Sequence, residues 1–253
     1  MKFYIDRLWT DRHGLFFLPV FVILILFNTG SLMRYAGQFV IVVFHEFSHA
    51  LVSWLFGCPA IPTFNVDGGL TIQMHRSLIV TIILFAFLAF ILVRSYSLKS
   101  RLFIPLLIIS IVYTAIFSQI ELCRGLVAFM GHGGEVLWAF IFCYLGFHAF
   151  SGRTRPEKFV YVTIGLHFAL NTLIFARSLL VDGIELRRYA NPGSGVMNDF
   201  IVLSEMSGKS VGFFAVLLLV LLFISVFGLL FLLTKRGHMM ASYKAKSDDE
   251  EGV

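Results

Sequence analysis

The sequence predicts an all-α polytopic membrane protein with about six to seven transmembrane helices and one short β-hairpin. The first observation is composition, since 58% of the 253 residues are hydrophobic and only 14% are charged, whereas a soluble domain carries about 25% charged residues. The second is that the apolar residues form long runs, and about 20 of them suffice to cross a bilayer as a helix. The 29 phenylalanines fit a lipid-facing surface better than base stacking, so no nucleic-acid partner is expected.

We expect one multi-span membrane domain over residues 1–234 and a polar, disordered tail over residues 235–253. The predicted spans are 14–33, 38–56, 78–93, 102–120, 136–150, 159–181 and 211–234. Three basic clusters fall on one side if every later span crosses, and the positive-inside rule makes that side cytoplasmic. They are Arg94/Lys99/Arg101, Arg153/Arg155/Lys158 and Lys235/Arg236. Seven full crossings would put the basic N-terminus outside, unless one of the first two segments is re-entrant, and both arrangements stay open. The expected location is the bacterial inner (cytoplasmic) membrane, as a multi-pass protein.

Two polar segments interrupt this pattern. Short β-like runs on either side of Asp67-Gly68 predict a β-hairpin over residues 60–75. Its edge is either a clamp for an extended peptide, by strand addition, or a plain connector. The polar loop 182–210 is too long for a simple turn, which favours a lid, a gate or a partner surface.

The chemistry-bearing motif is His45-Glu46-Phe47-Ser48-His49, inside the apolar helix predicted for residues 38–56. Histidines four residues apart share one helix face, as two ligands of a tetrahedral Zn²⁺ ion require. Glu46, beside the first histidine, is placed to take a proton from a zinc-activated water. Ionisable side chains are costly within a span and mark a functional site.

A catalytic zinc usually takes three protein ligands, so a third must come from elsewhere in the chain. His132 and Glu135 are the preferred candidates, because the glycines around them let the backbone approach other groups closely. One of the two would bind the metal, and the other would bind it or orient it. Asp182 and Asp199 are the alternatives. Asn171, in a predicted span, either orients a substrate backbone or links helices by a hydrogen bond.

Residues 45–74, HEFSHALVSWLFGCPAIPTFNVDGGLTIQM, resemble the M50 family of membrane-embedded zinc metalloproteases, the site-2 protease group, and are most similar to its compact M50B-like branch. The resemblance implies intramembrane cleavage of a peptide bond by zinc-activated water. It implies that His45 and His49 are zinc ligands and that Glu46 is the general base.

The family takes its third ligand from an aspartate in an Asp-Gly motif, usually set among prolines and an asparagine. Here Asp182-Gly183 follows Asn171 without those prolines, and Asp199 follows Asn191-Pro192 without the glycine. Neither aspartate matches the pattern fully, which is why His132 and Glu135 are preferred on chemical grounds.

The predicted function is that of an intramembrane zinc metalloendopeptidase, with transmembrane proteins as substrates and the lipid bilayer as its surroundings. The main alternative is an inactive homologue, a non-catalytic scaffold subunit that binds other membrane proteins. A transporter is a third reading, disfavoured because the two halves of the chain show no repeat.

Overall fold

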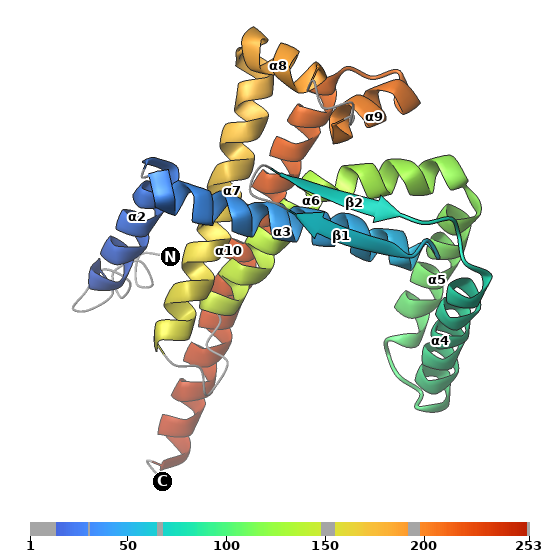
Figure 1. The fold of residues 1–253 in the computed structure, drawn as a ribbon. Helices are drawn as coiled ribbons and strands as arrows, with labels where there is room; N and C mark the ends of the chain where they lie inside the picture. The colour runs from blue at the N-terminus through green and yellow to red at the C-terminus, as the bar shows by residue number, and fades with distance from the viewer. Residues whose placement is uncertain (1–13, 30, 65–67, 148–154, 192–197, 252–253) are drawn as a thin grey trace. The chain divides into compact units, whose positions relative to one another are not determined.

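The structure is a computed structural model that describes residues 14–29, 31–64, 68–147, 155–191 and 198–251. These residues form nine helices and one two-stranded sheet (Figure 1). In chain order they are α2 (Gly14–Thr29), α3 (Ser31–Leu55), β1 (Ala60–Phe64), β2 (Gly69–Gln73), α4 (Leu78–Ser97), α5 (Phe103–Ser118), α6 (Ile120–Phe147), α7 (Arg155–Val181), α8 (Gly183–Ala190), α9 (Asp199–Ser207) and α10 (Val211–Glu251). The predicted helical class with a single hairpin is confirmed for this part of the chain.

Five of the described helices are long and apolar enough to cross a bilayer. They are Leu32–Leu55, Leu78–Ser97, Ile120–Phe147, Glu157–Val181 and Val211–Thr234. The other two expected spans correspond to α2 and α5, each 16 residues long. At 1.5 Å per residue such a helix is about 24 Å long, short of the roughly 30 Å of a bilayer core.

Three polar segments are helical, and for the tail this differs from the predicted disorder. Residues 131–135, the glycine-rich stretch that carries His132 and Glu135, lie in the interior of α6. The loop 182–210 contains α8 and α9, and the tail continues α10 to Glu251. Glycine costs only about 1 kcal/mol in a helix, which is less than leaving backbone groups without partners in apolar surroundings. The tail is rich in lysine, methionine, alanine and glutamate, which are good helix formers.

The chain divides into two compact units. The first unit comprises residues 1–38, 135–178 and 216–253, and the second comprises residues 39–134 and 179–215. Every division falls inside a helix: α3, α6, α7 or α10.

In the first unit, α6 and α7 pack closely at glycines. A Cβ at Gly165 would lie 2.7 Å from the backbone nitrogen of Cys143, and one at Gly146 would lie 2.9 Å from that of Val162. Small residues of this kind let the backbones of two membrane helices approach each other. Phe168 is fully buried in this unit.

In the second unit, the hairpin runs beside α3 (Figure 1). Its strands are antiparallel, with Ala60 opposite Gln73 and Phe64 opposite Gly69. The predicted hairpin is therefore confirmed, although Asp67 of its turn lies outside the described residues. The Trp54 indole donates a hydrogen bond of 2.9 Å to the Ala60 carbonyl and ties β1 to the end of α3.

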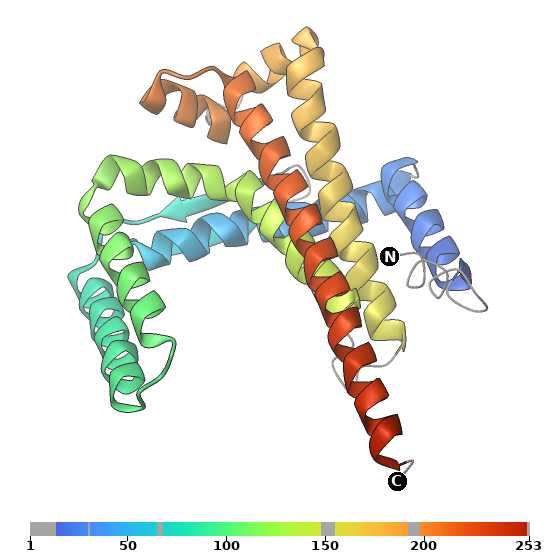
Figure 2. The same cartoon turned by 180° about the vertical axis from the view of Figure 1, so that it is seen from behind.

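The core of the second unit lies where α3, α5 and α6 meet. Its buried members are Val52, Phe56, Phe117, Cys123 and Val127. Helices α4 and α5 form an adjacent pair, seen from behind in Figure 2. This packing fixes α3 and α6, the two helices that carry the histidines discussed next.

Candidate metal centre

Helix α3 places the two motif histidines on one face, as predicted. The Nε2 atoms of His45 and His49 are 3.2 Å apart. Their ring centroids are 4.8 Å apart and the rings meet edge to face. Two imidazole nitrogens therefore point to the same place.

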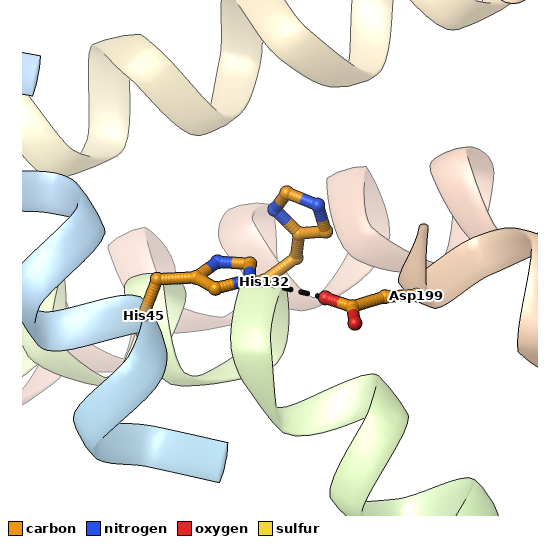
Figure 3. Close-up of side chains that lie close together, drawn as sticks. All are labelled: His45, His132 and Asp199. Carbon is orange, nitrogen blue, oxygen red and sulfur yellow. Dashed lines mark ion pairs between the residues drawn. The ribbon is translucent and has the colours of Figure 1, made fainter. Parts of the chain in front are cut away.

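Asp199, the first residue of α9, brings a carboxylate to these nitrogens. Its Oδ2 lies 3.1 Å from His45 Nε2 and 3.2 Å from His49 Nε2. Figure 3 shows the contact between His45 and Asp199. We call these three atoms the donor triad. Around a tetrahedral zinc with ligands at about 2.05 Å, neighbouring donor atoms are about 3.3 Å apart, and the edges of the triad are close to that value.

The tautomer of His49 makes this arrangement unusual for a site without a cation. Its Nδ1 lies 2.7 Å from the carbonyl oxygen of Val127. A carbonyl only accepts, so Nδ1 carries the proton, and the neutral ring presents a bare lone pair at Nε2. That lone pair faces the carboxylate oxygen of Asp199. Two acceptors at this distance need a proton or a metal ion between them, and metal-ligating histidines typically donate their other N–H in this way.

Helix α6 contributes a glycine at this point. A Cβ at Gly131 would come within 2.5 Å of both His45 Nε2 and Asp199 Oδ2. A methyl group would therefore fill the space against the donor triad. The glycine-rich stretch does allow close approach, as predicted, but it does so from within a helix.

Asp199 is held by the chain around α8 and α9. The Asn198 side chain donates a 2.6 Å hydrogen bond to the Tyr189 carbonyl. The backbone N–H of Phe200 donates to the Tyr189 hydroxyl at 3.2 Å. The ring of Phe200 is completely buried. These contacts hold the residues on both sides of Asp199, and the Asp199 carboxylate therefore points towards the Nε2 atoms of His45 and His49.

The Asp199 carboxylate is strongly biased towards its anionic form. Burial alone would raise its pKa, but the rings of His45 and His49, when protonated, donate hydrogen bonds to it and place positive charge beside it, and its pKa then lies well below its ordinary value. An anionic ligand is what a divalent cation requires here.

His132 lies beside the donor triad. Its ring centroid is 4.7 Å from that of His45 and 5.0 Å from that of Phe200. His45, His132 and Asp199 each offer a ligand atom within 4.8 Å of one another (Figure 3). The donor triad, with edges of 3.1–3.2 Å, is the tighter set, and the His132 ring lies beside it.

Glu46 faces the hairpin. Its carboxylate Oε2 accepts a hydrogen bond of 2.7 Å from the Thr71 hydroxyl on β2. The residue is only 6% exposed. It is therefore a buried carboxylate on the residue that directly follows His45 in the chain.

The other predicted site residues have different partners. Glu135 and Asn171 belong to the first unit, where Glu135 Oε2 accepts a 3.2 Å hydrogen bond from Thr172 and Asn171 Oδ1 accepts one of 3.1 Å from Gln38. Asp182 caps α8, since its Oδ1 accepts from the backbone N–H groups of residues 184 and 185. This is the ordinary role of an aspartate before a helix. Among the described residues, none of these three side chains belongs to the group that could hold a metal ion.

Sequence reasoning ranked Asp199 as an alternative and overlooked Thr71. The Asn-Pro before Asp199 and the polar setting of its loop were the available signals. Nothing local pointed to Thr71, because its partner is 25 residues away. Comparison of the chain with protein-family models, with curated proteins and with solved structures gives no match in any of the three.

Proposed function

We propose that this chain is a membrane-embedded zinc metalloprotease that cleaves a peptide bond of transmembrane protein substrates. The observation that carries the proposal is the donor triad, whose three edges of 3.1–3.2 Å fit one tetrahedral ion. The residue types also fit, because imidazole nitrogens and a carboxylate oxygen are the donors that zinc takes in catalytic sites.

In this proposal His45, His49 and Asp199 would hold the metal. A zinc ion bound there would polarise a water molecule and lower its pKa to about 7. Glu46 would accept a proton from the water as its oxygen bonds to the peptide carbonyl carbon, and would pass that proton to the amide nitrogen as the C–N bond breaks. The Val127 carbonyl keeps His49 in the tautomer that can bind a metal.

The proposed surroundings are a lipid bilayer, which the chain crosses several times, with the bacterial inner (cytoplasmic) membrane as the proposed compartment. Support comes from apolar side chains that face outward from the membrane-length helices. On α10, Phe223, Phe227 and Phe231 are 57–67% exposed. Apolar surface of this extent is rare on soluble monomers and typical of lipid or partner contact. The substrates we propose are proteins that share the bilayer.

Zinc content tests the metal site directly. Detergent-purified wild type should carry close to one zinc per chain by inductively coupled plasma mass spectrometry. His45→Ala and Asp199→Ala should lose most of it, and His49→Ala should do the same. His132→Ala should retain zinc, because its ring is beside the triad. A wild-type protein that is purified without zinc, and that binds none when zinc is added back, would contradict the proposal.

The Glu46→Gln variant distinguishes the proposed protease from a non-catalytic scaffold subunit. Because Glu46 is a base and not a ligand, the variant should keep its zinc and cleave substrates at least about 100-fold more slowly. The probe is a panel of single-span peptides, each with a fluorophore and a quencher on either side of a glycine- or proline-interrupted segment. Zinc-loaded wild type that cleaves no peptide, and pulls down the same membrane proteins as Glu46→Gln, would favour the scaffold reading.

A further inference from the structure

We propose that Thr71 is a positioning residue, whose hydroxyl holds the Glu46 carboxylate in one orientation and so makes catalysis depend on strand β2 being in place. The inference rests on the proposed function, and it goes beyond it by giving the hairpin a role in the reaction. It connects two segments, the motif helix and the hairpin, that the sequence presents as separate features.

Two residues of β2 contact the same carboxylate. The Thr71 hydroxyl lies 2.7 Å from Oε2 of Glu46. A Cβ at Gly69 would come within 2.6 Å of Oε1, so the backbone there lies directly against the other oxygen. Residues 69 and 71 are two apart and share one face of the strand. One face of β2 therefore covers both oxygens of Glu46.

The Thr71 hydroxyl has a second neighbour, the backbone carbonyl of Glu46 at 3.0 Å. A hydroxyl has one proton and donates to one acceptor at a time. The carboxylate oxygen is nearer and, when ionised, is the stronger acceptor. The carbonyl belongs to the same residue, so both contacts link the Thr71 hydroxyl to Glu46.

This contact matters because a glutamate side chain has three rotatable bonds and a general base must be in reach of its proton donor. Misplacing a catalytic group by about 1 Å can cost about 100-fold in rate. The carboxylate is buried, so a lost hydrogen bond would not be replaced readily by bulk water. Thr71 acts through Glu46, and no contact joins it to the donor triad among the described residues.

The hairpin offers a matched control in Thr63. Its hydroxyl donates a 2.6 Å hydrogen bond to the Leu70 carbonyl, across the same two strands. Thr63→Val and Thr71→Val each remove one hydroxyl from the hairpin and keep the β-branched shape. Only Thr71→Val removes a hydrogen bond to Glu46.

The first test is kinetic and uses the full chain in detergent with the fluorogenic single-span peptides. Thr71→Val should lower kcat about 10- to 100-fold and leave KM within about twofold, with zinc content equal to that of wild type. Thr71→Ser should restore kcat to near wild type. Thr63→Val should keep the wild-type kcat, since its hydroxyl does not contact Glu46.

The second test needs no activity. It compares melting temperatures in EDTA for Thr71→Val and Thr63→Val, each made in the wild-type chain and in the Glu46→Ala chain. Thr71→Val should lower Tm by about 4 °C in wild type, as loss of a buried hydrogen bond would, and by less than about 1 °C in the Glu46→Ala background, where the acceptor is gone. Thr63→Val should lower Tm equally in both backgrounds.

The outcomes separate the two proposals. Wild type that cleaves the peptides, with equal kcat for Thr71→Val and Thr63→Val, overturns the positioning role alone. An additive cycle, with the same Tm loss in both backgrounds, also overturns it. Wild type that binds zinc and cleaves none of the peptides overturns the proposed function and the kinetic role of Thr71 together.

Discussion

Gly131→Ala tests the geometry of the donor triad with a single methyl group. A Cβ at this position would lie 2.5 Å from His45 Nε2 and from Asp199 Oδ2, whereas ordinary contact begins at 3.4 Å. Each donor would therefore move by about 0.9 Å. Metal–ligand distances tolerate changes of only about 0.2 Å, so the triad could not keep its arrangement. We expect the variant to contain less than about a tenth of the wild-type zinc.

Zinc binding by wild type and by Gly131→Ala can also be compared through their melting temperatures. A metal present at 100 times its Kd stabilises the folded state by about 2.7 kcal/mol, which corresponds to about 5–10 °C for a chain of this size. EDTA should lower the Tm of wild type by that amount and leave Gly131→Ala unchanged. The methyl group itself favours a helix by up to about 1 kcal/mol, so the metal-free variant should remain folded.

Gly125→Ala is the matched control. It lies on α6, and the nearest atoms to its Cβ, on Leu203 and Met206, are 3.7 Å away. This variant should bind zinc and respond to EDTA as wild type does. Full zinc content in Gly131→Ala, with an EDTA-sensitive Tm, would refute the assignment of the donor triad.

Three further predictions concern residues outside the triad. Asp182→Ala should lower stability by about 1 kcal/mol through loss of the α8 cap and retain zinc, and loss of zinc would make Asp182 a ligand after all. Glu135→Gln should also retain zinc by mass spectrometry, because the carboxylate is buried with Thr172. Gly37→Ala should cost about 1–2 kcal/mol in thermal unfolding, since its Cβ would lie 2.8 Å from Nε2 of the buried His167; an unchanged Tm would show that the ring can move aside.

The parts of the site that the sequence predicts are those set by local spacing. His45 and His49 meet because residues four apart share a helix face, which requires no knowledge of the rest of the fold. The hairpin follows from turn chemistry close to its own strands. Both are short-range properties, and the structure contains both.

The ranking of Asp199 below His132 and Glu135 has a physical cause. A carboxylate becomes a ligand candidate through tertiary packing, here through the contacts of Tyr189 with the residues on either side of Asp199. No periodicity reports such contacts. The glycines near His132 predict that the backbone approaches other groups closely, and Gly131 does make room for His45 and Asp199, but the glycines do not indicate which side chains come close.

The position of Asp199 in the chain also sets an order of events during synthesis. His45 and Asp199 are separated by 154 residues of sequence, which a ribosome needs about 8–30 s to translate. The two histidines therefore emerge long before their carboxylate partner, and α9 must form before the three donor atoms can meet. A nascent chain would thus contain four of the five described helices that are long and apolar enough to cross a bilayer before the three donor atoms could meet.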